Sequence, residues 1–266
     1  MILRRLGNKK KVAKLIVPHF PPHKIFISPF FGAGGMFFNK PKAKYNIVND
    51  LDSDVFNLFQ VVMNQKEELE KAFYMMPIHS DLLEYWKVNK ETEPIKKALR
   101  FLFLSNCINP TTGDVRWVAY SNTKQMFFDK IDITFKMLFG LRLNNVDYKK
   151  FLEFIYFKDE YRPNEKKSAF IYCDPPYLGT ADNYSNSFTE QDTTDLFDTV
   201  IKTGCKFAIS EFDNPFVLEL AKKHGLEVIT IGERQNLKNR RTEILIVNYR
   251  SPALYSLFNA EQLNNE

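Results

Sequence analysis

The tetrapeptide Asp174-Pro175-Pro176-Tyr177 combines a carboxylate, two prolines and an aromatic ring directly after the apolar run 168–173, which predicts a buried strand. Two consecutive prolines end a strand, because each lacks an N–H and fixes its own φ. The Asp174 and Pro175 carbonyls therefore remain outside a ladder, at the edge of the sheet where open α/β folds bind ligands. The stretch predicts a pocket for a flat molecule with an amino group, although Asp-Pro-Pro is also ordinary turn chemistry.

A glycine-rich turn earlier in the chain has the pattern of a ligand-binding loop. The run 24–27 predicts a short strand, and it leads into Ser28-Pro29-Phe30-Phe31-Gly32-Ala33-Gly34-Gly35 and an apolar stretch at 36–38 that predicts the start of a helix. Without Cβ atoms, the glycines let backbone amides approach a ligand. A dinucleotide motif would have a further glycine where this chain has Phe37, so the turn favours an adenosyl ligand without a pyrophosphate.

Asp50 follows the next predicted strand, 45–49, at about the spacing from the glycines at which carboxylates bind ribose hydroxyls. We therefore predict that Asp50 binds the ribose of the same ligand. The alternative is that it caps the helix that follows, a role for which Asp52 and Ser53 have equally suitable side chains.

The elements that position these residues alternate between strand and helix at both ends of the chain but not in its middle. Helices dominate from residue 64, which interrupts the α/β pattern. We predict an α/β fold with an inserted, mainly helical part, and divide the chain into residues 1–63, 64–164 and 165–266. Further strands are predicted at 206–210, 226–231 and 242–249 and from 145–146 onward, and helices at 8–17, 66–76, 80–86, 94–104, 148–154 and 215–224.

Polar and basic side chains beside aromatic residues follow the predicted helix at 94–104. After a turn-rich loop at 109–114, a strand is predicted at 115–120, and this region contains Arg116, Asn122 and Lys124. Such side chains read base edges and hold phosphates. The three residues are candidate nucleic-acid contacts, although a solvated loop has the same composition.

The composition is that of a globular protein, with 44% hydrophobic and 26% charged residues among 266. The net charge of +5 is unevenly spread, because basic residues cluster within 4–14 and 238–241. Clustering favours a polyanionic partner, while a mild excess of lysine also keeps a protein soluble.

Several classes of site are not indicated. The three cysteines are far apart and form no C-x-x-C pair, which argues against a disulfide framework or a zinc ribbon. Two prolines between His19 and His23 prevent the helix that an i,i+4 metal pair would need, so no metal site is predicted. The N-terminus lacks the apolar core of a signal peptide, and 25–39 is too short and too rich in Gly and Pro to span a bilayer. We expect a cytoplasmic protein that does not contact a membrane.

Taken together and in this order, the motifs resemble those of the Dam-type DNA adenine-N6 methyltransferases, the D12 class with alpha-group motif order, in which the cofactor motif comes first, the recognition insert next and the catalytic motif last. The likeness covers residues 4–249. Two positions depart from the family: Ser28 replaces the usual acidic residue, which concerns a cofactor contact, and Asn8 stands where a second glycine is common, which concerns a backbone contact near Lys9. The matching elements are Gly7-Asn8-Lys9, Pro29 to Gly34, Asp50 with Ser53-Asp54, Asn106, Asp174 to Tyr177, Asn186-Ser187-Phe188 and Glu243-Ile244-Leu245.

The resemblance implies a Rossmann-like methyltransferase fold with residues 64–164 as the target-recognition domain. It implies S-adenosyl-L-methionine as methyl donor, S-adenosyl-L-homocysteine as product, and an adenine flipped out of double-stranded DNA as acceptor. The Asp174 carboxylate and the Pro175 carbonyl would accept hydrogen bonds from the adenine amine, and Tyr177 would stack on the base. The catalytic residues implied are Asp174, Pro175, Pro176 and Tyr177, the cofactor-binding residues are Lys9, Pro29, Phe30, Phe31, Gly32, Ala33, Gly34, Gly35, Asp50 and Asp174, and the DNA contacts are Arg116, Asn122 and Lys124.

Two alternatives remain open at this point. The enzyme could methylate another amine, such as cytosine N4, an RNA base or a protein amide, although Asn or Ser at position 174 would have favoured those. The chain could also be a DNA-binding relative without turnover, which Ser28 keeps open. A base deaminase is disfavoured, because the sequence has no P-C-x-x-C zinc motif. A bacterial or phage setting fits, with restriction protection beside a cognate endonuclease, mismatch strand marking and phage self-protection all compatible.

Overall fold

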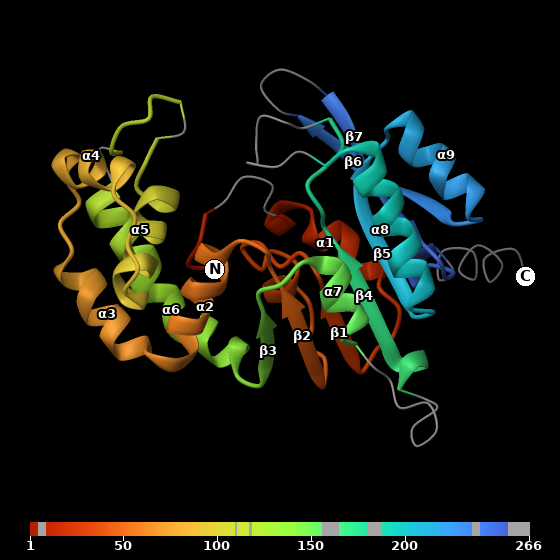
Figure 1. Cartoon of the computed structure of the whole chain (residues 1–266), viewed down its shortest axis with the longest axis horizontal. Helices are drawn as coiled ribbons and strands as arrows, with labels where there is room; N and C mark the ends of the chain where they lie inside the picture. The colour runs from red at the N-terminus through yellow and green to blue at the C-terminus, as the bar shows by residue number, and fades with distance from the viewer. Residues whose placement is uncertain are drawn as a thin grey trace, which may run out of the picture.

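A seven-stranded sheet runs through the described part of the chain, in the order β3-β2-β1-β4-β5-β7-β6 (Figure 1). The computed structural model describes residues 1–4, 9–109, 111–116, 119–155, 165–179, 188–235 and 240–254, so Gly7, Asn8, Asn186 and Ser187 of the sequence motifs lie outside it. Strands β1 to β5 pair in parallel with one another, whereas β7 runs antiparallel to both β5 and β6. The strands are β1 (Ile25–Ser28), β2 (Tyr45–Asn49), β3 (Leu141–Asn144), β4 (Ala169–Cys173), β5 (Lys206–Phe212), β6 (Glu227–Gln235) and β7 (Arg240–Val247).

The strand order reverses at β1, which lies between β2 and β4. In parallel sheets, ligands bind outside the carboxyl ends of the strands at such a switch point. Strand β1 ends immediately before the glycine turn, and β4 ends immediately before Asp174. The topology therefore brings the two motifs to the same edge of the sheet, although they are far apart in the sequence.

Helices cover the sheet and form a lobe beside it. The helix predicted at 8–17 is interrupted, because Val12 offers no side-chain cap to α1 and Pro18 has no N–H with which to continue it. The helical elements are η1 (Lys9–Lys11), α1 (Ala13–Ile16), η2 (Val17–His19), η3 (Phe37–Asn39), α2 (Ser53–Asn64), α3 (Lys66–Met75), α4 (Ser80–Val88), α5 (Pro94–Asn106), η4 (Ala119–Thr123), α6 (Lys124–Leu138), α7 (Tyr148–Glu153), η5 (Lys166–Ser168), α8 (Glu190–Lys202) and α9 (Pro215–Lys223).

Two short strand predictions are wrong. In the stretch 115–120, Val115 makes a single bridge with Ile108, and the π-helix η4 begins soon after. The strand expected from 145–146 is β3, which ends before Asn145. The Asn49 side chain takes both backbone groups of Val146, accepting from its N–H at 3.0 Å and donating to its carbonyl at 2.9 Å, so neither group is available to a ladder.

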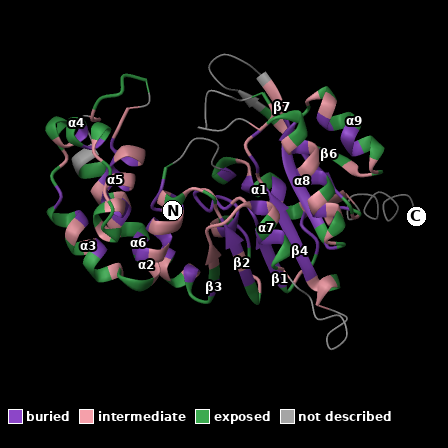
Figure 2. Cartoon of the chain, in the orientation of Figure 1, coloured by how far each residue is buried: buried purple, intermediate pink, exposed green. Residues whose placement is uncertain are grey.

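The sheet separates two hydrophobic clusters, because alternate residues of a strand point to opposite faces. Along β4, Ile171 and Cys173 pack with residues of α7, α8 and α9, whereas Phe170 and Tyr172 pack on the face that α1 covers. Strands β1 and β4 are buried along their whole length (Figure 2). Cys173 is therefore a core residue on the face that α7, α8 and α9 cover.

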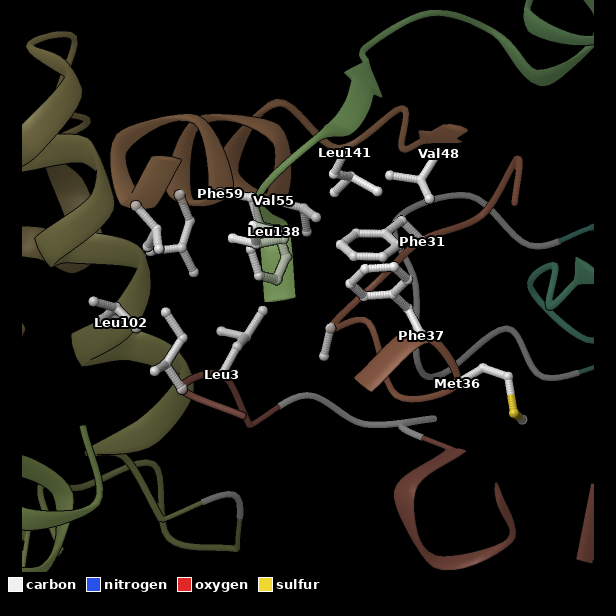
Figure 3. Packing of buried hydrophobic residues seen from close by; sticks show 14 of the residues in the cluster. Leu3, Phe31, Met36, Phe37, Val48, Val55, Phe59, Leu102, Leu138 and Leu141 are labelled. Carbon is white, nitrogen blue, oxygen red and sulfur yellow. The ribbon is translucent and has the colours of Figure 1, made fainter. Parts of the chain in front are cut away.

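Helices α3 to α6 form the lobe beside β3 (Figure 1), and its core is continuous with that of the sheet. Leu102 of α5, Leu138 of α6 and Phe59 of α2 belong to the same cluster as Phe31 and Phe37 of the glycine turn (Figure 3). Strand β3 and α7 lie within the range 64–164 but belong to the sheet layer. In that range, the helical lobe thus ends with α6. None of the helices in the described ranges is long and apolar enough to cross a membrane.

Asn106, at the end of α5, ties the beginning of the chain to this lobe. Its side chain accepts a hydrogen bond from the Arg4 N–H and donates one to the Ile2 carbonyl, each at 2.8 Å. Asn106 is fully buried, and Ile2 and Leu3 are buried beside it. The side-chain amide therefore provides hydrogen-bond partners for the backbone of residues 2–4. Lys9 follows five residues after Arg4.

Candidate active site

Asp174 lies at the carboxyl edge of the sheet, where its partly exposed carboxylate meets a buried lysine. Its Oδ1 is 3.3 Å from the Nζ of Lys9, and the two side chains are 23% and 2% exposed. Lys9 is held at the beginning of η1, on the face of the sheet that α1 covers. The structure thus brings together two residues that are far apart in the sequence.

Glu243, in β7, completes a buried cluster around Lys9. The Lys9 ammonium donates hydrogen bonds to the Tyr177 hydroxyl and to Glu243 Oε1, and the Tyr177 hydroxyl donates to the same Glu243 oxygen at 2.6 Å. Glu243 has no exposed surface and Tyr177 is 6% exposed. An ion pair so far from water is confined to geometries that keep both charges paired, because a buried unpaired charge is costly.

The Tyr177 ring is packed inside the protein. Its centroid lies 4.7 Å from that of Phe212, with the rings nearly perpendicular at 88°, and the Lys9 Nζ lies 4.3 Å from the same centroid. Arg241 extends the stack, with its guanidinium 5.4 Å from the Phe212 ring. Stacking of a base on Tyr177, the role that the resemblance implies, therefore requires the ring or Lys9 to move.

Glu211 is a second buried carboxylate beside the tetrapeptide. It is 2% exposed, and its oxygens accept hydrogen bonds from the Phe212 N–H at 2.9 Å and the Leu178 N–H at 3.3 Å. Burial raises the pKa of Glu211 to about 8, against the lowering effects of these hydrogen bonds and of Lys9. The raised pKa favours the protonated form of this side chain, and its hydrogen bond from the Leu178 N–H holds the backbone where the chain leaves Tyr177.

A small pocket lies between β1, the glycine turn and Asp174. Its wall is mostly apolar and aromatic, with one carboxylate, which suits a nucleoside that carries a positive charge. The residues present therefore fit the adenosyl cofactor that the turn predicted. Among the described residues, the wall consists of Phe26, Ser28, Phe30, Phe31, Gly35, Met36, Phe37, Tyr172 and Asp174.

The predicted cofactor residues divide into those that face this pocket and those that shape the turn behind it. Phe30, Phe31, Gly35 and Asp174 line the wall, whereas Pro29, Gly32, Ala33 and Gly34 form the backbone of the turn. Gly34 has φ +71°, and a Cβ there would lie 2.5 Å from the Phe38 ring. This glycine is thus needed for the turn to pack on its own aromatic residues.

Sequence reasoning missed several residues of the wall. Two of them are Phe26, which lies on the same face of β1 as Ser28, and Tyr172, which lies on the same face of β4 as Asp174. Because side chains alternate between the two faces of a strand, their spacing of two residues is the sequence signal that could have identified them. The Ser28 hydroxyl, at the position where the family usually has an acid, donates to the Phe30 carbonyl at 3.3 Å. Ser28 therefore supports the turn from inside the pocket.

Asp50 stabilises the glycine turn from the end of β2. Its Oδ2 accepts a hydrogen bond from the Gly32 N–H at 2.5 Å, and its Oδ1 accepts one from the Asp52 N–H at 2.9 Å. The N-cap of α2 is Asp52, whose side chain accepts from the N–H groups of Asp54 and Val55. The capping role considered for Asp50 therefore belongs to Asp52.

The three candidate DNA contacts lie in or near the helical lobe. Arg116 Nε donates to the Ile108 carbonyl at 2.9 Å, and Lys124 Nζ donates to the Tyr74 carbonyl at 2.6 Å. Asn122 is exposed in η4. These contacts of Arg116 and Lys124 are with nearby backbone carbonyls of the lobe, and they differ in kind from the charge pairs around Lys9.

Comparison with known proteins agrees with the motif order. The family model described as D12 class N6 adenine-specific DNA methyltransferase matches residues 6–237. The chain is 25% identical to the DNA adenine methylase of Salmonella typhi over 253 residues, covering 85% of this chain and 86% of that protein. It is 23% identical to the DNA adenine methylase of Escherichia coli K12 over 253 residues, covering 86% of each.

Among solved structures, the chain is similar to an rRNA methyltransferase from Streptomyces viridochromogenes, with 8% identity and a TM-score of 0.38 over 91% of this chain and 82% of the other. The family match spans most of the chain, from residue 6 to residue 237. The chain therefore belongs to the D12 class of N6 adenine-specific DNA methyltransferases, enzymes that transfer a methyl group from S-adenosyl-L-methionine to adenine N6 in DNA.

Proposed function

We propose that the Asp174 carboxylate and the Pro175 carbonyl orient the N6 amine of an adenine that has been flipped out of the DNA duplex. This amine is a poor nucleophile, because its lone pair is delocalised into the ring. Hydrogen bonds from its two N–H groups would localise the lone pair toward the methyl donor. The proposal depends on one observation: Asp174 both lines the pocket beside the glycine turn and pairs with Lys9 at 3.3 Å.

The cofactor contacts are proposed on the same edge of the sheet. S-adenosyl-L-methionine supplies an activated methyl group on a positively charged sulfur. The aromatic wall, with Phe30 and Phe31, would enclose the adenosine, and Asp50 would bind the ribose hydroxyls. In-line transfer needs positioning rather than a nucleophilic side chain, which agrees with the buried pairing around Lys9.

The recognition role is proposed for residues 64–164, with Arg116, Asn122 and Lys124 as contacts to the duplex. The basic residues around Lys9, such as Lys10 and Lys11, would follow phosphates. Restriction protection beside a cognate endonuclease is one biological role that this activity permits. DNA that the enzyme has methylated should then resist an endonuclease that cuts the same site.

The test of the catalytic assignment is to replace Asp174 and to measure chemistry and binding separately. Asp174→Ala should lower methyl transfer to unmethylated duplex DNA by about 10²–10³-fold or more, since it removes a preorganised polar contact with the reacting amine. Cofactor binding, measured by equilibrium dialysis with labelled cofactor, should weaken far less than methyl transfer, because the aromatic wall of the pocket remains. The matched control is Asp198→Ala, because Asp198 is 64% exposed on α8.

Near-normal turnover of Asp174→Ala would refute the assignment. Flipping is tested separately with 2-aminopurine at the target position, whose fluorescence should rise when the enzyme binds. An unchanged signal at saturating enzyme would contradict extrusion of the base. Hydrolysis of the labelled product should yield N6-methyladenine.

A further inference from the structure

We propose that Glu243 is a positioning residue for methyl transfer, which acts on Asp174 through Lys9 and on the tetrapeptide through Tyr177. The inference rests on the proposed role of Asp174. One carboxylate oxygen of Glu243 receives hydrogen bonds from both the Lys9 ammonium and the Tyr177 hydroxyl. Glu243 lies outside the described pocket wall, so it acts through these neighbours rather than on the reacting atoms.

Stability alone does not explain a charge at this position. Glu243 has no exposed surface, Lys9 is 2% exposed, and β7 continues as the apolar run 244–247. Removing both ions from water carries a desolvation penalty, and apolar residues of similar volume often replace such a pair without loss of stability. The pair is therefore better explained by the geometry that it imposes at the edge of the sheet.

That geometry holds the tetrapeptide at both ends. At its beginning, Lys9 holds Asp174 Oδ1 at 3.3 Å. At its end, Glu243 holds the Tyr177 hydroxyl at 2.6 Å, and Phe212, the partner of Glu243 in the β5–β7 register, packs against the Tyr177 ring. The two prolines between these anchors have restricted φ, so the Pro175 carbonyl has little freedom to turn away from an amine bound beside Asp174.

The charges of the cluster agree with this role. The Lys9 ammonium lies between the Asp174 and Glu243 carboxylates, and without Glu243 it would lose one of these two negatively charged partners. A more strongly positive Lys9 environment would oppose a positively charged methyl donor in the adjacent pocket, because like charges repel. Glu243 thus keeps Lys9 available to orient Asp174 while limiting the repulsion that it exerts.

The test replaces the charge and keeps the shape. Glu243→Gln should lower kcat by about 10²-fold, the size expected when reacting groups are misplaced by about 1 Å. The cofactor dissociation constant should rise by much less than kcat falls, because the pocket wall is unchanged and only the added repulsion from Lys9 weakens binding. Glu243→Asp, which keeps the charge at a shorter reach, should give an intermediate kcat. Glu219→Gln, an equal charge change on the exposed side of α9, should leave kcat unaltered.

A double-mutant cycle with Tyr177→Phe separates positioning from general damage. If the Glu243 carboxylate and the Tyr177 hydroxyl act through the same hydrogen bond, the fold-loss of kcat in the double variant should be much smaller than the product of the fold-losses in the two single variants. Multiplicative losses, or a Glu243→Gln enzyme with normal kcat, would overturn the inference. Should Glu243→Gln fail to fold, Tyr177→Phe alone decides: it removes only the hydroxyl, and an unchanged kcat would overturn the proposal.

The Asp174→Ala result keeps the two proposals apart. An inactive Asp174→Ala enzyme together with a fully active Glu243→Gln enzyme would refute the positioning role and leave the proposed function standing. An active Asp174→Ala enzyme would refute the catalytic assignment itself.

Discussion

The edge of the sheet around Lys9 and the helical lobe both contain polar side chains with a proposed part in the reaction. The two regions differ in how deeply these side chains are buried and in the partners that they bind. At the edge, Lys9, Glu243 and Glu211 are each at most 2% exposed, and Lys9 and Glu243 pair with each other across a long sequence separation. In the lobe, Arg116 and Lys124 are partly exposed and bond to nearby backbone carbonyls. The first arrangement is set by folding, whereas the second can be exchanged for contacts with a ligand.

This difference fits the two stages of the reaction that we propose for these regions. Transfer of a methyl group needs groups already held in place, because reorganisation at the moment of reaction would add to the barrier. Recognition of DNA needs side chains that can leave their partners when phosphates and base edges arrive. Substitutions at the edge should therefore change stability and kcat, and substitutions in the lobe should change the choice of DNA.

The largest effect on folding is expected from removing the cation of the buried pair. Lys9→Met should lower the free energy of unfolding by about 3–5 kcal/mol, because it removes the cation that pairs with the buried Glu243 carboxylate. Urea denaturation at neutral pH measures the change. Lys11→Met is the matched control, since Lys11 is exposed in the same turn, and it should change stability by at most about 0.5 kcal/mol. Equal free energies of unfolding for Lys9→Met and Lys11→Met would show that the buried ion pair contributes no more to stability than an exposed lysine does.

A smaller and pH-dependent effect is expected at Glu211. Its pKa is raised from 4.5 to about 8 by burial, so between these values the folded protein keeps a proton that the unfolded chain has lost. The contribution of Glu211 to the free energy of unfolding is then greatest below about pH 4.5. It falls as the pH rises toward 8, by up to about 1.4 kcal/mol per pH unit. Glu211→Gln should remove this slope.

The measurement is the difference in unfolding free energy between wild type and Glu211→Gln from pH 5 to pH 8, because other titrating groups contribute to both proteins. The curve of Glu219→Gln should run parallel to that of the wild type. A constant difference between wild type and Glu211→Gln would contradict the raised pKa.

The smallest effect on folding is expected in the lobe. Arg116→Ala should change the free energy of unfolding by at most about 0.5 kcal/mol, in the range of surface substitutions. If Arg116 reads a base, the same change should relax discrimination at one position of the recognised site by about 1–3 kcal/mol. Methylation rates on duplexes with single base-pair changes, at one salt concentration, measure this effect. Weaker activity on all duplexes alike would indicate a phosphate contact, and a large loss of stability would contradict the proposed contrast with the edge.

Much of the fold follows from local patterns in the sequence. The strand at 45–49 has the predicted bounds, and the helices at 66–76, 94–104 and 215–224 are present within two residues. Their signals are local: periodic apolar residues, prolines and capping side chains. The strand predicted at 115–120 failed because a strand also needs a partner strand, and the described residues of this stretch form a single bridge, between Val115 and Ile108.

The sequence by itself determined that Asp174-Pro175-Pro176-Tyr177 ends a strand, that the glycine turn follows another, and that Lys9 belongs with them through the motifs of the D12 class. Only the tertiary structure decided that Glu243 joins Lys9 to Tyr177, that Tyr177 is packed against Phe212, and that Asp50 supports the turn while Asp52 caps the helix. The physical reason is that strand and helix signals lie within a few residues of each other. The pairing of buried charges instead depends on strand order, register and face, which bring residues 9, 174 and 243 together only after the sheet has formed.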